Sequence, residues 1–132
     1  TIVTIRPDAT LGEAVKVLSE HRIGAVVVSE DERKPQGILS ERDIVRQLGA
    51  QGAGVLSTPI SDVMTRAVQT CTMGDDALAI LERMTQGRFR HMPVVDPDGN
   101  MLGVVSIGDA VSGRLKELAA EKEALTGMIM GA

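Results

Sequence analysis

The 132-residue chain has almost no aromatic side chains: Phe89 is its one phenylalanine, and tryptophan and tyrosine are absent. Proteins that bind single-stranded nucleic acids stack the bases on aromatic side chains, so this chain lacks such a platform. Basic residues are in the minority, with 14 Lys and Arg against 18 Asp and Glu. Binding to a nucleic-acid backbone needs clustered positive charge, and we therefore expect no nucleic-acid partner.

Cysteine and long apolar runs are scarce as well. Cys71 is the only cysteine, which excludes an internal disulfide and favours a cytoplasmic location. No stretch approaches the roughly 20 apolar residues of a membrane-spanning helix, so we expect no membrane partner. The two histidines and one cysteine lack HxxxH or CxxC spacing, and we expect no metal site.

What the chain does contain is an internal repeat. Residues 37–43, with the sequence GILSERD, return 66 residues later as residues 103–109, GVVSIGD. In each copy a glycine opens a short β-prone run, a serine ends it, and an aspartate three positions later precedes an amphipathic segment. This pattern predicts a strand, a tight turn and a helix.

The period of 66 extends to earlier elements and predicts the order β-α-β-β-α in both copies. In the first copy, residues 2–5 predict a strand, and Thr10 with Glu13 predicts a capping box for a helix. The uninterrupted apolar run at residues 23–28 predicts a strand covered on both faces. The second copy has strands predicted at residues 68–71 and 92–95. The two helical stripes are Leu11, Ala14, Val15 and Leu18, and Ala77, Ile80, Leu81 and Met84.

Residues 49–59 are rich in glycine and small polar residues and predict a linker, followed by a single helical turn at residues 60–64. We therefore place a first repeat at residues 1–58 and a second repeat at residues 59–132. The last helix is predicted from about residue 107 to residue 125, and the apolar tail at residues 127–130 is either disordered or packed on a partner subunit.

Three further side chains have simple predicted environments. Arg33 and Lys34 are expected to be solvated at a hairpin tip, and His21 on a helix surface. Cys71 is expected to be a small core residue rather than a nucleophile, because no acid–base pair is visible to activate it.

The serine–aspartate pairs have two interpretations. Ser40 with Asp43, and Ser106 with Asp109, have the spacing of capping boxes and thus a purely structural role. Alternatively, the positive end of each helix binds a phosphate while the carboxylate accepts hydrogen bonds from ribose hydroxyls. The pattern by itself leaves both interpretations open.

These motifs, together with DVMT at residues 62–65 and RHMPVVD at residues 90–96, resemble a tandem pair of cystathionine β-synthase (CBS) domains. The resemblance covers nearly the whole chain. It implies an α/β (α+β) fold in which two pseudo-twofold-related β-α-β-β-α repeats pack through their sheets, with two clefts between them. Family members bind adenosine compounds, among them AMP, ADP, ATP, NAD-type dinucleotides and S-adenosylmethionine, and they regulate attached or partner proteins. No catalysis is implied.

Carried over residue by residue, the resemblance assigns the ribose to Asp109 and the phosphate to Ser106 in a primary cleft, with Asp43 and Ser40 as counterparts in a second cleft. Met92 borders both clefts. The primary cleft is expected to comprise Thr4, Ile5, Ala25, Arg90, His91, Met92, Pro93, Ser106 and Asp109, and the second cleft Thr70, Cys71, Ser40, Arg42 and Asp43.

The two clefts are expected to be unequal. The first repeat has Gly24 and Ala25 where the second has Arg90 and His91, so only the primary cleft gains these cations. Arg42 is the substitute cation of the second cleft.

The leading hypothesis is a non-enzymatic energy- or redox-sensing regulator that binds AMP or a related adenine nucleotide and acts on an unidentified protein. The alternative is a ligand-free interaction or oligomerisation module. We also expect a homodimer, formed by the helix faces at residues 11–18 and 77–84 and by the tail.

Overall fold

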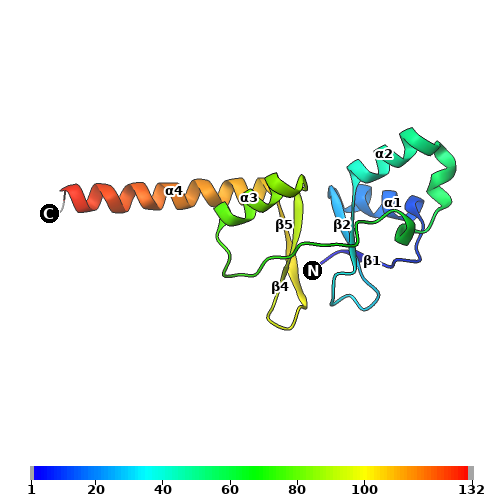
Figure 1. The fold of residues 1–132 in the computed structure, drawn as a ribbon, viewed down its shortest axis with the longest axis horizontal. Coiled ribbons are helices and arrows are strands. Elements are labelled where there is room, and N and C mark those ends of the chain that lie inside the picture. Colours follow the sequence, from blue (N-terminus) through cyan, green and yellow to red (C-terminus); the bar gives the residue numbers. More distant parts are fainter. Residues whose placement is uncertain (1, 131–132) are drawn as a thin grey trace.

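The computed structural model describes residues 2–130, in which two small sheets lie between two pairs of helices (Figure 1). The first repeat contains β1 (Thr4–Ile5), α1 (Leu11–His21), β2 (Ala25–Val28), β3 (Gly37–Ser40) and α2 (Glu41–Gln51). The second contains α3 (Ala77–Gly87), β4 (His91–Val95), β5 (Met101–Ser106) and α4 (Ile107–Met130). Two 3-10 helices, η1 (Ala53–Ser57) and η2 (Ile60–Asp62), connect them. The predicted mixed fold is confirmed.

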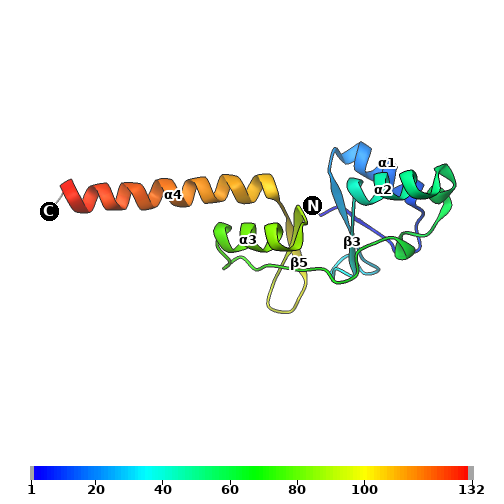
Figure 2. The same ribbon diagram turned by 45° about the horizontal axis from the view of Figure 1, so that its top comes forward.

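The sheet of the first repeat has the order β1-β2-β3. Strand β2 runs parallel to β1 and antiparallel to β3, so Val28 pairs with Ile5 on one side and with Gly37 on the other. All four residues of β2 are buried, as the uninterrupted apolar run predicts. Helices α1 and α2 lie on the side of this sheet away from the second repeat (Figure 2).

The second sheet contains only β4 and β5, and the prediction of a strand at residues 68–71 is wrong. A single bridge joins Cys71 to Val94: the Cys71 amide donates to the Pro93 carbonyl, and the Val95 amide donates to the Cys71 carbonyl. The next bond of a parallel ladder would need an amide hydrogen from Pro93, which has none. A proline in the central strand thus stops the pairing after one residue.

The predicted linker is more ordered than expected, because α2 continues to Gln51 and η1 follows. Val55 of η1 and Ile60 of η2 are buried in the core of the first repeat. Backbone bonds fix the segment: the Leu11 amide donates to the Thr58 carbonyl, and the Ile60 amide donates to the Ala9 carbonyl. The predicted helical turn at residues 60–64 is confirmed by η2.

Each repeat has its own buried cluster. The larger cluster joins α1, β2, β3 and the connecting 3-10 helices, and the smaller one joins α3, β4 and the start of α4. The capping box of α1 forms as predicted, with Thr10 and Glu13 bonded to each other's backbone amides. The two helical stripes were expected to form a dimer interface, but most of their residues are buried within these cores and are not available to a partner. The buried stripe residues are Leu11, Ala14, Leu18, Ile80 and Met84.

Helix α4 is the longest element and extends well beyond α3 (Figures 1 and 2). The helix continues to Met130, past the expected end at residue 125, so the expectation of a disordered tail is wrong for residues 127–130. Within residues 2–130, no helix combines the length and apolar character needed to cross a bilayer.

Candidate functional site

The two strand–helix junctions share one geometry. At the start of α2, the Ser40 amide donates to Oδ2 of Asp43 at 2.9 Å, and the Asp43 amide donates to Oγ of Ser40 at 3.2 Å. At the start of α4, the Ser106 amide donates to Oδ2 of Asp109 at 3.0 Å, and the Asp109 amide donates to Oγ of Ser106 at 3.1 Å. Both pairs are therefore reciprocal caps, as one of the two interpretations predicts.

The first helical residue of each junction is tied to the residue before the central strand. The Glu41 amide donates to the Gly24 carbonyl at 2.9 Å, and the Ile107 amide donates to the Arg90 carbonyl at 2.8 Å. In each repeat a backbone bond thus holds the helix start beside the strand that carries the expected ligand-binding residues. The backbone arrangement at the helix start is therefore the same in both repeats, which differ there in their side chains.

The caps leave part of each carboxylate free. Oδ2 of Asp43 accepts from both the amide and the hydroxyl of Ser40, while Oδ1 lies 3.8 Å from Arg46. Asp109 is exposed, and among residues 2–130 neither a hydrogen bond nor an ion pair involves its Oδ1. The amide and then the hydroxyl of Ser106 lower the pKa of Asp109, which is thus ionised at neutral pH. One oxygen can therefore cap the helix while the other accepts a hydrogen bond from a ligand.

His91 lies where the two repeats meet. A Cβ atom at Gly24 would lie 3.3 Å from Cε1 of His91 and 3.6 Å from Oε1 of Glu41, so the missing side chain leaves room for the imidazole. Burial lowers the pKa of His91; Glu41 raises it, Arg90 lowers it, and Asp109 raises it. Because burial is the largest of these effects, the imidazole is neutral in the free protein at neutral pH.

The two candidate phosphate-binding arginines are both exposed. Arg90 precedes β4, beside His91, whose backbone pairs with that of Ser106. Arg42 lies on the first turn of α2 and lines a shallow hollow of about 440 Å³ with Glu41, Val45 and Arg46. The structure thus brings Arg90, His91, Ser106 and Asp109 to one helix start, and Ser40, Arg42 and Asp43 to the other.

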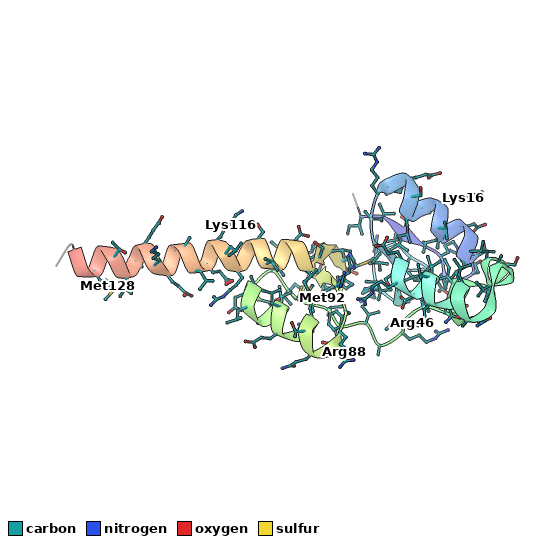
Figure 3. All side chains as sticks on the ribbon, turned by 90° about the horizontal axis from the view of Figure 1, so that it is seen from above. Lys16, Arg46, Arg88, Met92, Lys116 and Met128 are labelled. Atoms are coloured by element: carbon teal, nitrogen blue, oxygen red, sulfur yellow. The ribbon has the colours of Figure 1, made fainter. Side chains whose placement is uncertain are left out.

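The residues expected to hold the adenine are mostly buried. Ile5, Ala25, Cys71 and Met92 each have at most a tenth of their surface exposed, and Pro93 is fully buried. Figure 3 shows Met92 inside the second repeat, between α3 and α4. In this conformation these residues offer a ligand their backbone atoms rather than their side chains.

The remaining two predicted residues, Thr4 and Thr70, are half-buried. Thr4 lies on β1, paired with Val27, and the Thr70 carbonyl accepts a 2.8 Å hydrogen bond from Arg83. Among residues 2–130, no side-chain hydrogen bond joins either threonine to the serine–aspartate pair of the other repeat.

Cys71 and His21 have the predicted environments. Cys71 belongs to the buried cluster of the second repeat, and burial raises the pKa of its thiol, which is opposite to the shift that activates a nucleophile. His21 is exposed at the end of α1.

Two features of the inter-repeat contact could not be predicted from the local sequence. The first is Glu41, whose carboxylate faces His91. The period of 66 aligns Glu41 with Ile107 and Gly24 with Arg90. This difference in charge between equivalent positions is the sequence signal that could have identified Glu41. The second is the contact that the hairpin tip at Arg33 and Lys34 makes with the second repeat.

Arg33 and Lys34 are exposed, as predicted, and the same tip also contacts the second repeat. The Met101 amide donates to the Arg33 carbonyl at 2.7 Å, and Nζ of Lys34 donates to the Asp98 carbonyl at 2.8 Å. Asp31 holds the tip in shape through hydrogen bonds from the amides of Lys34 and Arg33 and the hydroxyl of Ser29, which lower its pKa to about 2. The β2–β3 turn thus attaches the first repeat to the second.

A surface hollow of about 480 Å³ lies between α1 and α2 of the first repeat. Its walls are mainly apolar, with Val15 and Val45 at the solvent-exposed side, and it reaches Gly24 and Glu41 at one end. The helix-start chemistry described above lies at the margin of this hollow rather than at its centre.

Comparisons with known proteins agree on one family. A family model described as CBS domain matches residues 1–50 and 60–115. A mitochondrial CBS-domain-containing protein of Arabidopsis thaliana is 36% identical over 128 residues, which cover 94% of this chain and 62% of the plant protein. The chain thus spans less than two thirds of the length of that curated relative.

Solved structures give the same result. The crystal structure of a CBS-domain protein of Agrobacterium tumefaciens is 41% identical with a TM-score of 0.81, covering 86% of this chain and 90% of the other. A CBS-domain protein of Pyrobaculum aerophilum, solved in complex with AMP, is 28% identical with a TM-score of 0.74, covering 82% of both chains.

Proposed function

The chain belongs to the CBS-domain family, and on that premise we propose that it is a regulatory module that binds an adenine nucleotide between its two repeats. AMP is the first candidate, because the Pyrobaculum aerophilum relative was solved with it. ADP, ATP, NAD(H) and S-adenosylmethionine are the other candidates of the same class. The nucleotide is a signal and not a substrate, so the chain is not an enzyme.

One observation carries this proposal: Asp109 is ionised and exposed, and its helix cap uses only Oδ2. The free Oδ1 is a hydrogen-bond acceptor suited to a ribose hydroxyl. Arg90 and His91 lie beside the same helix start, where the helix dipole also favours an anion. Ribose and phosphate thus have separate partners in the primary cleft.

The second cleft, at Asp43, is proposed as a weaker site. Its aspartate is occupied on both oxygens, by Ser40 and by Arg46. Glu41 adds a negative charge where the second repeat has Ile107, which disfavours a phosphate. Arg42 is the cation that its helix start offers in return, since Arg46 already faces Asp43.

Calorimetric titration with AMP, ADP, ATP, NADH and S-adenosylmethionine tests the proposal directly. We expect at least one to bind more tightly than about 1 mM, which corresponds to roughly 4 kcal/mol. Weaker binding of all five would remove the basis for a sensor. Release of phosphate from ATP by the purified chain, above background, would contradict the non-enzymatic assignment.

A ligand-free interaction module is the second candidate, and the complete capping boxes favour it. Asp109→Ala separates the two functions. Loss of the cap lowers stability by ~1 kcal/mol with or without nucleotide. If Asp109 also binds ribose, the variant additionally loses the rise in melting temperature that nucleotide produces. Asp43→Ala is the matched control, since it removes the equivalent cap from the weaker cleft.

We further propose a homodimer that acts in the cytoplasm on a partner protein still to be identified. Support for self-association comes from apolar side chains left exposed on the helices of both repeats, including Val45 on α2 and Leu78 on α3. Light scattering at micromolar concentration tests it, and a strict monomer would refute the dimer while leaving nucleotide binding intact.

A further inference from the structure

The imidazole of His91 extends from the second repeat toward the first. A Cβ atom built on Gly24 would lie 3.3 Å from Cε1 and 3.5 Å from Nε2 of His91, and 3.6 Å from Oε1 of Glu41. The imidazole and the Glu41 carboxylate therefore border the same small space beside Gly24. Because a side chain at position 24 would fill this space, the glycine allows one residue of each repeat to enter it.

Backbone hydrogen bonds hold both helix starts at this space. The Glu41 amide donates to the Gly24 carbonyl at 2.9 Å, which fixes the first residue of α2 beside Gly24. His91 pairs with Ser106 in the β4–β5 ladder, so the start of α4 lies next to the strand that carries the imidazole. Figure 2 shows α2 and α4 extending in opposite directions from the region where the repeats meet.

The Glu41 carboxylate has no competing partner. Its side chain is exposed, and within the described residues 2–130 no ion pair or side-chain hydrogen bond involves it. Asp43, two positions later, caps α2 and faces Arg46 instead. A purely structural role of Glu41 would be to favour the helix dipole at the first position of α2.

Charged groups of several elements surround the imidazole. Glu41 approaches it from the start of α2, Asp109 from the start of α4 and Arg90 from the residue before β4, while Arg22 lines the hollow that reaches Glu41. Burial has the largest effect on the pKa of His91 and lowers it; Glu41 raises it, Arg90 lowers it and Asp109 raises it. Glu41 is thus the charged neighbour that most favours the protonated ring.

We propose that Glu41 is a positioning residue of the primary cleft, where it holds on His91 the proton that a bound phosphate requires. A protonated imidazole donates a charge-assisted hydrogen bond to phosphate, and it takes up its proton from solvent as the nucleotide binds. In the proposed complex the two oxygens of Asp109 serve the helix cap and the ribose. Glu41 is then the carboxylate left to balance the positive charge on His91.

The same carboxylate acts in the opposite sense at its own helix start, where it repels a phosphate. In the primary cleft the phosphate lies on the side of Arg90 and Ser106, so Glu41 is closer to the imidazolium than to the phosphate, and its attraction prevails. The equivalent position in the second repeat is Ile107, which cannot support the second cleft in return. One residue thus strengthens one cleft and weakens the other.

This inference rests on the proposed nucleotide binding and names a residue of the opposite repeat that supports it. Proton NMR tests the contact without nucleotide, because the chain has only two histidines and the exposed His21 is an internal reference. Glu41→Gln removes the charge and keeps the shape, and we expect it to lower the pKa of His91 and leave that of His21 unchanged. Glu82→Gln, which removes an exposed charge from α3, should change neither. An unchanged His91 pKa in Glu41→Gln overturns the proposal.

Calorimetric titration tests the effect on the ligand. At pH 7 we expect Glu41→Gln to weaken AMP binding at the tighter site by about threefold or more. The factor should shrink as the pH is lowered and His91 becomes protonated in the free chain. Adenosine, which has no phosphate, should bind equally to both chains, and Glu82→Gln should bind AMP as wild type does. Circular dichroism confirms that both variants keep their helices.

Two results would overturn the role of Glu41: a loss of affinity that is the same at every pH, or an equal loss with adenosine. Either would leave this residue a structural role at the start of α2. Unchanged AMP affinity in Glu41→Gln would also overturn the proposal. A wild-type chain that binds no nucleotide would instead refute the proposed function, and the titration of His91 in the free chain would still decide whether Glu41 controls its protonation.

Discussion

The two repeats share a strand–turn–helix motif but support it by different means. In the first repeat the motif rests on a three-stranded sheet and on a core that recruits η1 and η2. In the second it rests on two strands, a smaller cluster and a long helix. The helix caps have the same hydrogen bonds in both repeats, although the sheets and cores beneath them differ. Local sequence therefore fixes where the helix starts, while the sheet and core of each repeat decide how stable and how accessible that helix start is.

The largest expected difference between the repeats is in core stability. Leu39 and Val105 are equivalent by the period of 66, but Leu39 is fully buried and Val105 only partly. Leu39→Ala should lower the free energy of unfolding by about 2–5 kcal/mol. Val105→Ala should lower the free energy of unfolding by less than half as much, because it removes fewer atoms and the position is only partly buried. Urea unfolding followed by circular dichroism measures both, and equal losses would show that the repeats are equally dependent on this strand.

The next prediction concerns nucleotide affinity at the two helix starts. Arg90→Ala should weaken binding of AMP about tenfold or more, because a hydrogen bond to a charged group contributes ~1.5–3 kcal/mol. Arg42→Ala, the matched variant of the second cleft, should change the affinity of the tighter site little. Calorimetry decides the point. Loss of tight binding in Arg42→Ala but not in Arg90→Ala would reverse the assignment of the clefts.

A smaller effect is expected from the space that Gly24 leaves for His91. Gly24→Ala puts a methyl group 3.3 Å from the imidazole, and the ring has to shift. We expect a loss of roughly 1 kcal/mol in unfolding free energy. A second change, His91→Ala, should remove most of that loss if the contact is its cause. Additive losses in the double variant would place the strain elsewhere.

The smallest predicted effect is a pH dependence due to His91. Its pKa is lowered in the folded chain, chiefly by burial, so the unfolded chain takes up a proton first as the pH falls below about 6.5. Stability should therefore decline as the pH falls through that value, and His91→Gln should flatten the decline. His21→Gln, at an exposed histidine, is the control and should leave the decline unchanged.

If His91 touches the nucleotide phosphate, its pKa rises on binding and AMP affinity weakens as the pH climbs above neutrality. Calorimetry between pH 6 and pH 8 would show this trend. The same trend in His91→Gln would assign it to another group, including the phosphate itself.

The sequence alone determined the features that depend on neighbouring residues. The order β-α-β-β-α of the first repeat, the buried strand β2, the capping boxes at Thr10, Ser40 and Ser106, and the 66-residue period all follow from side-chain spacing and local hydrogen bonding. Membership of the CBS-domain family followed from the same motifs, because the family is defined by that local pattern.

Only the tertiary structure decided what depends on distant partners. The absence of a strand at residues 68–71 required knowing that the segment aligns with Pro93, whose missing amide hydrogen ends the ladder. The approach of Glu41 to His91, and the attachment of Arg33 and Lys34 to the second repeat, join residues far apart in the chain. The exposed apolar stripe of α4, which includes Val111, Leu115 and Leu118, is of the same kind. Residue spacing predicts the stripe, but packing between elements decides which side of the helix α3 covers.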